Sequence, residues 1–174
     1  MTPNNKIKPA RALLLAAALL LPAAASALTS DRNQPIQIEA DQGSLDQKNQ
    51  VTVFSGNVQI KQGSLQMKAQ SVRVSQDRSG NQTMLATGSP VYFRQQLDGG
   101  KGFAEGWGNR AEYNSAQHLV KLIGNAKVQR GGDLAQGEAI SYNMKTEVYT
   151  VLGGNAVGNK NGRRVKVIIQ PNNK

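Results

Sequence analysis

The amino-acid sequence predicts an all-β protein built of short strands, and three observations lead to this class. Apolar and polar residues alternate with a period of two, as in Ile36–Asp41 and Leu65–Gln70, which is the pattern of strands with one buried face. No window after residue 27 shows the 3.6-residue period of an amphipathic helix. The chain also contains 18 glycines, which divide the alternating segments at short intervals. Frequent turns between short strands are typical of a β-sandwich, barrel or solenoid.

The alternation places the individual strands along the chain. In order, they are expected at residues 36–40, 58–61, 65–70, 72–74, 126–128 and 165–167. Gln62-Gly63-Ser64 is the expected turn between the second and third of these strands. The last strand belongs to the stretch Arg163–Pro171, which ends at a proline because proline has no N–H to donate to a sheet.

A repeat of about 30 residues sharpens the prediction. The stretch FSGNVQIKQGSLQMKAQSVRV, residues 54–74, returns in similar form as LIGNAKVQRGGDLAQGEAISY, residues 122–142. The pairs Gly56-Asn57, Gly88-Ser89, Gly124-Asn125 and Gly154-Asn155 follow one another at spacings of 32, 36 and 30 residues. A strand-only repeat of this length indicates a layered β architecture in which each unit stacks on its neighbour. We interpret the Gly-Asn pairs as turns that need a positive φ, and not as ligand sites.

The first 27 residues have the features of a secretory signal peptide. Lys6, Lys8 and Arg11 precede the apolar run Ala12–Leu21, and Ala25-Ser26-Ala27 fits an A-x-A cleavage site. The apolar run is shorter than the roughly 20 residues that cross a bilayer. Residues 28–174 are therefore expected to form a single domain outside the cytoplasm, and a bacterial-style signal without a later hydrophobic span places it in the periplasm.

Composition limits the chemistry of that domain. The chain has no cysteine, so neither disulfides nor thiolate metal sites are available. The net charge of +10 becomes +7 once the three cations of residues 1–27 are removed. A positive balance favours an anionic partner, although solubility alone explains it equally well.

The ordered set of motifs resembles the LptA or OstA-like family of lipopolysaccharide transport proteins. It comprises QPIQIEADQGSLD (34–46), FSGNVQIKQG (54–63), GSPVYF (88–93), LIGNAKVQ (122–129) and RRVKVIIQP (163–171). The resemblance implies a twisted, partly open β-jellyroll of antiparallel strands that shields the acyl chains of lipid A. It also implies that the protein binds lipopolysaccharide, associates with itself end to end, and bridges an LptC-like inner-membrane protein and an LptD-like outer-membrane protein. Energy for directional movement would come from an ATP-driven complex at the inner membrane.

Period-two alternation directs one set of side chains towards a common interior, and the resemblance implies that this set binds lipid. The set is Ile36, Ile38, Val58, Ile60, Leu65, Met67, Val72, Val74, Phe93, Leu122, Val128 and Tyr142. From the residues alone, a closed sandwich core is the stronger interpretation. The chain has only eight aromatic residues, and walls of modest bulk suit alkyl chains.

An unclosed jellyroll leaves strand edges that can pair with another chain. The resemblance implies that the edges of successive molecules pair with one another. The expected edge residues are Pro35, Ile36, Ile38, Val165, Val167, Ile168 and Ile169. The alternative is that Arg164, Lys166 and Pro171 prevent such pairing.

Catalysis is not expected. His118 is the only histidine, which excludes a multi-histidine metal site, and it is expected in a turn. No cofactor, metal or nucleic acid is expected. A different class stays open, a periplasmic polysaccharide-binding or polysaccharide-processing β-solenoid that would use paired carboxylates. Its candidate residues are Asp41, Asp46, Glu105, Glu112 and Glu138.

Two further expectations concern the surroundings of the apolar interior that the resemblance opens into a lipid-binding groove, here called the trough. The glycine-rich stretch 99–109 is expected to form a mobile hairpin in which Phe103 or Trp107 closes over the trough or packs locally. Cations are expected at the rim, where they would meet the lipid A phosphates. The candidates are Lys61, Lys68, Arg73, Arg94, Lys127 and Arg130.

Overall fold

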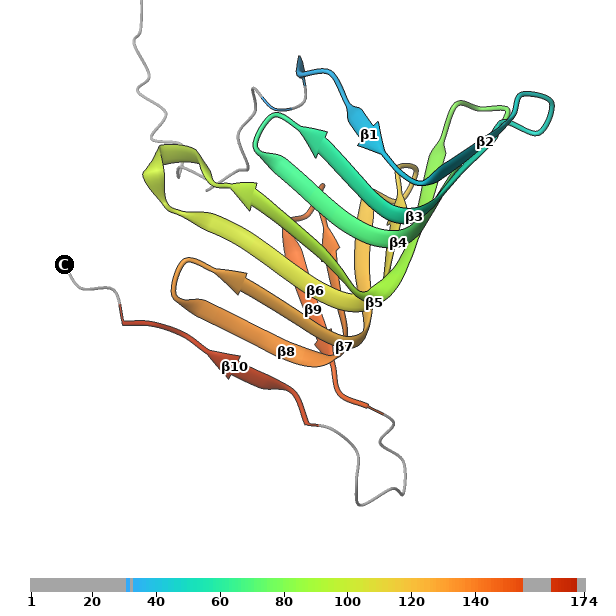
Figure 1. The fold of residues 1–174 in the computed structure, drawn as a ribbon. Coiled ribbons are helices and arrows are strands. Elements are labelled where there is room, and N and C mark those ends of the chain that lie inside the picture. Colours follow the sequence, from blue (N-terminus) through green and yellow to red (C-terminus); the bar gives the residue numbers. More distant parts are fainter. Residues whose placement is uncertain (1–30, 32, 155–163, 172–174) are drawn as a thin grey trace, which may run out of the picture.

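The structure is a computed structural model that describes residue 31, residues 33–154 and residues 164–171. In this part of the chain, ten strands form one antiparallel sheet (Figure 1), together with a short 3₁₀ turn, η2, at Asp98–Gly100. The strands are β1 (Gln37–Glu39), β2 (Gln42–Asp46), β3 (Val51–Gln62), β4 (Leu65–Gln76), β5 (Gln82–Gln96), β6 (Phe103–Asn114), β7 (Leu119–Arg130), β8 (Asp133–Asn143), β9 (Val148–Leu152) and β10 (Lys166–Ile168). The prediction of an all-β fold is confirmed.

The strands in the middle of the sheet are longer than the sequence pattern predicted. Strands β3, β4, β6 and β7 have 12 residues each and β5 has 15. Each consecutive pair from β3 to β8 is antiparallel, and each pairing is interrupted once near its middle. The alternation predicted short strands because this interruption shifts the apolar pattern by one residue.

The interpretation of the Gly-Asn pairs as turns between strands is therefore wrong. Gly56-Asn57 lies inside β3 and Gly124-Asn125 inside β7, where two residues oppose one residue of the neighbouring strand. The expected positive φ is present, at 78° and 48° in the first pair and 77° and 52° in the second. The pairs are thus β-bulges, which bend a strand instead of reversing it. Gly88-Ser89 also lies within a strand, β5, but neither residue has a positive φ, so that expectation is wrong for this pair. Asn155 is outside the described residues.

The row of interruptions folds the sheet into two arms (Figure 1). The β1–β10 half contains residues 37–39, 58–62, 65–68, 91–96, 103–107, 126–130, 133–137 and 166–168. The β2–β9 half contains residues 42–46, 51–55, 71–76, 82–87, 110–114, 119–123, 139–143 and 148–152. The long strands run through both halves, so the two faces of the jellyroll are a single hydrogen-bonded sheet.

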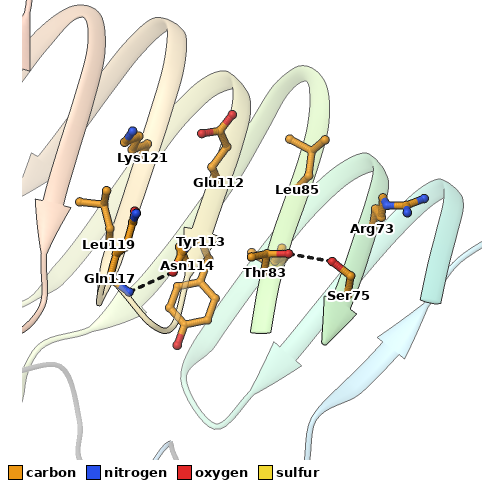
Figure 2. A pocket seen from close by; sticks show the side chains of 11 residues that line it. Arg73, Ser75, Thr83, Leu85, Glu112, Tyr113, Asn114, Gln117, Leu119 and Lys121 are labelled. Atoms are coloured by element: carbon orange, nitrogen blue, oxygen red, sulfur yellow. Dashed lines mark hydrogen bonds between the residues drawn. The ribbon is translucent and has the colours of Figure 1, made fainter. Parts of the chain in front are cut away.

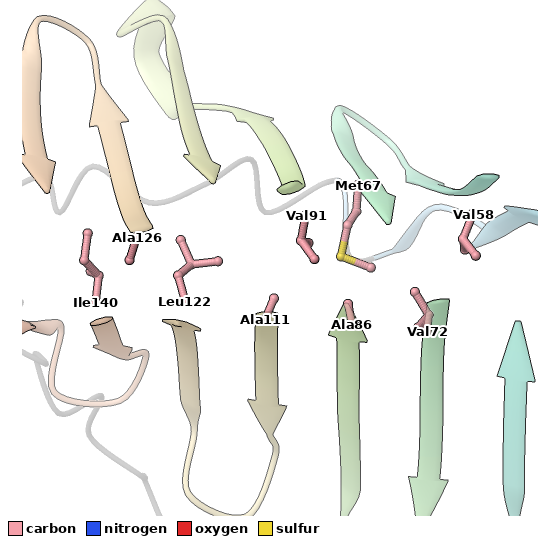
Figure 3. Packing of buried hydrophobic residues seen from close by; sticks show 9 residues of the cluster. All are labelled: Val58, Met67, Val72, Ala86, Val91, Ala111, Leu122, Ala126 and Ile140. Carbon is pink, nitrogen blue, oxygen red and sulfur yellow. The ribbon is translucent and has the colours of Figure 1, made fainter. Parts of the chain in front are cut away.

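The core lies along the bend, where the two halves face each other. Figure 3 shows its side chains in two opposing lines that point towards one another. The β1–β10 half contributes Val58, Met67, Val91 and Ala126, and the β2–β9 half contributes Val72, Ala86, Ala111, Leu122 and Ile140. Many of these residues are small. This allows the two arms to approach closely at the bend.

The sheet does not close into a barrel. At one end β1 and β2 each pair only with β3, and at the other β9 and β10 each pair only with β8. Each half therefore has two open edges in the described part of the chain. The expected partly open jellyroll is confirmed.

Candidate functional site

The inner face of the β1–β10 half carries one continuous row of apolar positions. Cross-strand pairs link them in sequence: Ile38, Ile60, Met67, Phe93, Gly106, Val128, Ala135 and Val167. Gly106 leaves the space that the Phe93 ring fills, because a Cβ atom at Gly106 would overlap that ring. The row extends from one edge of the sheet to the other.

Two rows line the inner face of the β2–β9 half. The proximal row, next to the bend, is Gly43, Phe54, Val72, Ala86, Ala111, Leu122, Ile140 and Val151. The distal row, farther from the bend, is Leu45, Thr52, Val74, Met84, Tyr113, Val120, Tyr142 and Tyr149. At the β9 end the rings of Tyr142 and Tyr149 stack with their centroids 4.2 Å apart.

The structure brings the residues predicted to bind lipid onto this inner face. Ile38, Ile60, Met67, Phe93 and Val128 belong to the β1–β10 row. Val58 and Leu65 lie on the same face of that half, nearer to and farther from the bend respectively. The remaining members, Val72, Leu122, Val74 and Tyr142, belong to the proximal and distal rows. Ile36 precedes β1 and is 60% exposed.

Several inner-face residues were missed by sequence reasoning. They are Phe54, Met84, Ala86, Val91, Ala111, Ala126, Ala135, Ile140 and Val151. In β5, Met84 and Ala86 are two residues apart on the inner face. Leu85 between them is also apolar, so the sequence shows no apolar–polar alternation there. The repeat of residues 54–74 in residues 122–142 was a usable signal for Ile140, because it aligns Ile140 with Val72.

Burial falls with distance from the bend. Val58, Val72 and Val91 are at most 1% exposed. Farther from the bend on the inner strands, Ile60, Val74 and Met84 are half-buried. On the edge strands, the exposed fraction rises to 65% for Leu45 and 55% for Val167. The interior is therefore a closed core at the bend and an increasingly accessible apolar surface towards the arms. Both expectations from the sequence, a core and a trough, describe part of the same face.

The expectation of a basic rim is wrong for five of its six residues. Lys61, Lys68, Arg73, Arg94 and Lys127 occupy register positions that alternate with the inner rows, so they lie on the outer face. Arg130 is two residues from Val128 of the inner row, so it lies on the inner face. It pairs with Ala104 and Asp133 at the end of the β1–β10 half that is farthest from the bend.

Trp107 packs locally and does not close the trough. It lies inside β6 on the outer face, with its ring centroid 5.3 Å from that of Tyr92. The glycine-rich stretch is a strand from Phe103 onward, so the expected mobile hairpin is limited to the turn around η2. Gly106 and Gly108 serve the packing of the inner face and do not make the strand a loop.

A depression of about 340 Å³ in the β2–β9 half is lined mainly by outer-face residues (Figure 2), although Met84 and Tyr113 of the distal row also line it. Arg73, Leu85, Glu112 and Lys121 form one row of its lining. Its polar groups contact one another, as Ser75 Oγ and Thr83 Oγ1 do at 2.7 Å. Leu85, Leu119, Met84 and Tyr113 also line it, so the depression is partly polar and partly apolar.

The carboxylates considered for glycan chemistry do not form one site. Asp41 Oδ2 accepts a hydrogen bond from Asn57 Nδ2 at the bend, at 2.9 Å. Glu112 Oε1 lies 3.1 Å from Arg110 Nε on the outer face of the β2–β9 half. Glu105 Oε1 accepts a hydrogen bond from Tyr92 Oη in the β1–β10 half. Among the described residues, no three His, Asp or Glu side chains gather as a metal site would require. His118 lies in the β6–β7 turn, as expected.

The predicted partner edges lie at the two ends of the sheet. Ile38 is in β1, while Val167 and Ile168 are in β10. Pro35 and Ile36 precede β1, and Val165 and Ile169 flank β10. Sequence reasoning did not assign an edge to the second strand at each end, β2 or β9. In β9, Val148, Tyr149 and Leu152 are about half exposed. Most of the exposed large apolar side chains thus lie on the edges.

The segment before β1 is held by one buried carboxylate. Asp31 is 6% exposed and accepts hydrogen bonds from Ser64 N at 2.9 Å, Ser64 Oγ at 2.5 Å and Gln95 Nε2 at 3.3 Å. Burial alone would raise the pKa of Asp31, but the hydrogen bonds from Ser64 and Gln95 lower it below its ordinary value of 3.8. Asp31 therefore ties the chain ahead of the edge strand β1 to the β3–β4 turn and to β5.

We expect this contact to stabilise the protein above about pH 4 and to weaken in acid. Because the pKa of Asp31 is lowered in the folded state, its stabilising contribution is complete above the unfolded value of about 3.9 and is lost as the pH falls through the folded value. Asp31→Asn should reduce the free energy of unfolding at pH 7 by about 1–3 kcal/mol and make it less sensitive to pH below 5. Urea unfolding at pH 7, 5 and 3 measures both effects, with Asp98→Asn in the β5–β6 turn as control. An Asp31→Asn variant as stable and as acid-sensitive as the parent contradicts this role.

Together, these observations define a class of protein: an open β-jellyroll whose long inner face is apolar from edge to edge. A family model described as LptA/(LptD N-terminal domain) LPS transport protein matches residues 37–148, which run from the start of β1 to the first residue of β9. No helix among the described residues is long and apolar enough to cross a membrane.

Relatives of known name agree with this match. The lipopolysaccharide export system protein LptH of Pseudomonas aeruginosa is 34% identical over 154 residues, which cover 86% of this chain and 87% of LptH. LptA of Haemophilus influenzae is 37% identical over 147 residues, covering 83% of this chain and 82% of LptA. LptA of Escherichia coli K12 is 34% identical over 162 residues, covering 91% of this chain and 84% of LptA. The chain belongs to the LptA/LptD N-terminal domain family of lipopolysaccharide transport proteins.

A solved structure matches the fold as well. The crystal structure of LptH from Pseudomonas aeruginosa, described as the LptA-homologous periplasmic component of the lipopolysaccharide transport device, superposes with a TM-score of 0.68 at 33% identity. The match covers 82% of this chain and 99% of LptH. The LPS-assembly protein LptD of Haemophilus influenzae is 35% identical over 116 residues, only 14% of its own length. These relatives are named as export and assembly proteins, and the comparisons do not favour the polysaccharide β-solenoid.

Proposed function

We propose that this protein is a periplasmic carrier that shields the acyl chains of lipopolysaccharide on its apolar inner face. The observation that supports this most is the continuity of the rows: apolar positions follow one another from β1 to β10 in one half and from β2 to β9 in the other. The LptA and LptH relatives are named lipopolysaccharide export proteins.

Binding by this face would be strong and chemically tolerant. Each methylene removed from water contributes about 0.8 kcal/mol, so even partial coverage of several acyl chains outweighs a single polar contact. An apolar surface holds chains of different length with little discrimination. It does not drive movement by itself, so the energy for transport would enter at a partner.

We also propose that residues 1–27 are a signal peptide and that residues 28–174 form a single periplasmic domain. Residues 1–30 lie outside the described part of the chain, so the support comes from their sequence. Further support is that LptH, which shares the fold, is described as a periplasmic component.

The open edges support assembly into a bridge. The edge at β1 and β2 and the edge at β9 and β10 are different surfaces, and a contact between two different surfaces forms an open filament unless the rotation between neighbours closes it into a ring. We propose that the molecules stack end to end and join an LptC-like partner at the inner membrane and an LptD-like partner at the outer membrane. The family model includes the LptD N-terminal domain, which supports a related fold in the outer-membrane partner.

Photocrosslinking tests the carrier function. A photoreactive residue at Phe93 or Val74, on the inner faces of the two halves, should capture lipopolysaccharide in cells. The matched control is Leu85, an apolar residue that is 38% exposed but lies on the outer face, and it should capture none. Equal capture from Leu85, or no capture from any inner position in a folded protein, contradicts the proposal.

A further inference from the structure

The outer face of the β1–β10 half carries an aromatic and basic ladder that the inner face does not explain. Its members are cross-strand neighbours in β4, β5, β6 and β7: Lys68, Tyr92, Trp107 and Lys127. The two ring centroids are 5.3 Å apart, and Lys127 Nζ lies 4.5 Å from the centre of the Trp107 ring. With strands about 4.8 Å apart, the two lysines bracket two adjacent rings over about 14 Å.

The surroundings of the ladder are positively charged. The two outer rows of this half hold the cations Lys61, Lys68, Arg94, Lys127 and Lys166 and the carboxylates Glu39 and Glu105. Tyr92 Oη donates a hydrogen bond of 2.6 Å to Glu105, which also lies 3.9 Å from Arg94. One of the two carboxylates is therefore already paired, and the excess of positive charge is available to a ligand.

A second cation–π pair, Arg94 with Phe103, extends the same surface. The Arg94 guanidinium lies 3.6 Å from the centre of the Phe103 ring, which is 39% exposed. In the ladder row, Gln59 precedes Lys68 and Gln136 follows Lys127, so amide groups flank the rings on both sides. The surface thus offers aromatic rings, cations and amide hydrogen-bonding groups on one face of the sheet, with the Tyr92 and Trp107 rings inclined at 41° to each other.

We propose that this outer face binds an acidic polysaccharide chain, as a second site independent of the lipid-binding face. The apolar face of a sugar ring can stack on Trp107 and Tyr92, carboxylates on the sugar can meet Lys68 and Lys127, and hydroxyl groups can bond to the flanking amides. The chain would run across the strands, along the direction of the ladder. Such a contact would hold a bridge segment against acidic glycan while leaving its inner face free for lipid.

The geometry favours a glycan over an anionic lipid surface. Binding to a bilayer interface requires apolar side chains that project into it, whereas Tyr92 and Trp107 are only partly exposed. The saccharide part of lipopolysaccharide is the other possible source of acidic sugar. A polyuronate that carries no lipid separates these sources.

Trp107 makes the test direct because it is the only tryptophan in the chain. Titration of the folded protein with polygalacturonate should change the Trp107 fluorescence saturably and less strongly at high salt, and neutral dextran of equal length should have no effect. The double variant Lys68→Gln/Lys127→Gln should bind at least about tenfold more weakly. The matched control, Arg73→Gln/Lys121→Gln, removes the same charge from the outer face of the other half and should bind like the parent.

Three results would overturn the proposal. They are no fluorescence response to polygalacturonate, equal weakening in the two double variants, and a response to phosphatidylglycerol vesicles or lipopolysaccharide alone. Thermal unfolding of both variants establishes that they are folded. Lipid capture at Phe93 is measured in parallel, so that failure of this site and failure of the carrier function remain distinguishable.

Discussion

Replacing Val72 with aspartate is expected to unfold the protein. Val72 is completely buried at the bend, where it contacts the core from both halves. A carboxylate at this position would lose its hydration without gaining a partner, at a cost of at least about 4 kcal/mol. This is a large part of the roughly 5–15 kcal/mol that stabilises a typical domain. Far-ultraviolet circular dichroism during urea unfolding measures the effect.

The control for this experiment is the next residue in the same strand. Arg73 points to the outer face and is exposed, so Arg73→Asp introduces the same group one position away on the opposite side of the sheet. Its effect should stay within about 0.5 kcal/mol. Comparable destabilisation by both substitutions would mean that the core does not lie on the face we describe.

Replacing Val167 with aspartate is expected to abolish end-to-end association. Val167 lies on the edge strand β10 at the end of the β1–β10 inner row and is 55% exposed. In a stack, the next molecule would cover this residue. A buried carboxylate without a partner should weaken association at least about a hundredfold. Sedimentation at rising concentration should show open-ended growth for the parent and a monomer for the variant.

A substitution at the opposite edge tests the same contact from its other side. Ile38→Asp on β1 should also block growth, because a head-to-tail contact uses both edges. A mixture of the two variants should form dimers and nothing larger, since each variant keeps one intact edge. Leu85→Asp, away from the edges, should associate like the parent. A parent protein that stays monomeric, or a Val167→Asp variant that still grows, contradicts end-to-end assembly.

The alternating pattern predicted the composition of the inner face well. Val58 and Ile60 in β3, and Val72 and Val74 in β4, are two residues apart, as expected where a buried side chain alternates with an exposed one. The same rule placed Lys68 and Arg73 on the outside, so the expectation of a basic rim conflicted with the strand period. Strands β2 and β9 were not predicted as edges because neither shows an alternation: Leu45 is the only large apolar residue of β2, and apolar residues follow one another directly in β9.

The Gly-Asn pairs show why the rest required the structure. A positive φ at Gly56 and Asn57 is compatible with a hairpin turn and with a bulge inside a strand. The choice depends on whether the residues on either side continue to pair with the same neighbour, here β4. That pairing is a property of two strands and is absent from the local sequence.

By itself, the sequence determined that the chain forms strands, which apolar residues share a face, and that the backbone has a positive φ at Gly56-Asn57 and Gly124-Asn125, because each depends on neighbouring residues alone. Only the tertiary structure decided that the bulges align across six strands, from β3 to β8, and fold one sheet into two arms. Alignment depends on the register between strands, which long-range hydrogen bonds fix. The same register sets the apolar rows opposite each other and leaves Trp107 and its lysines outside.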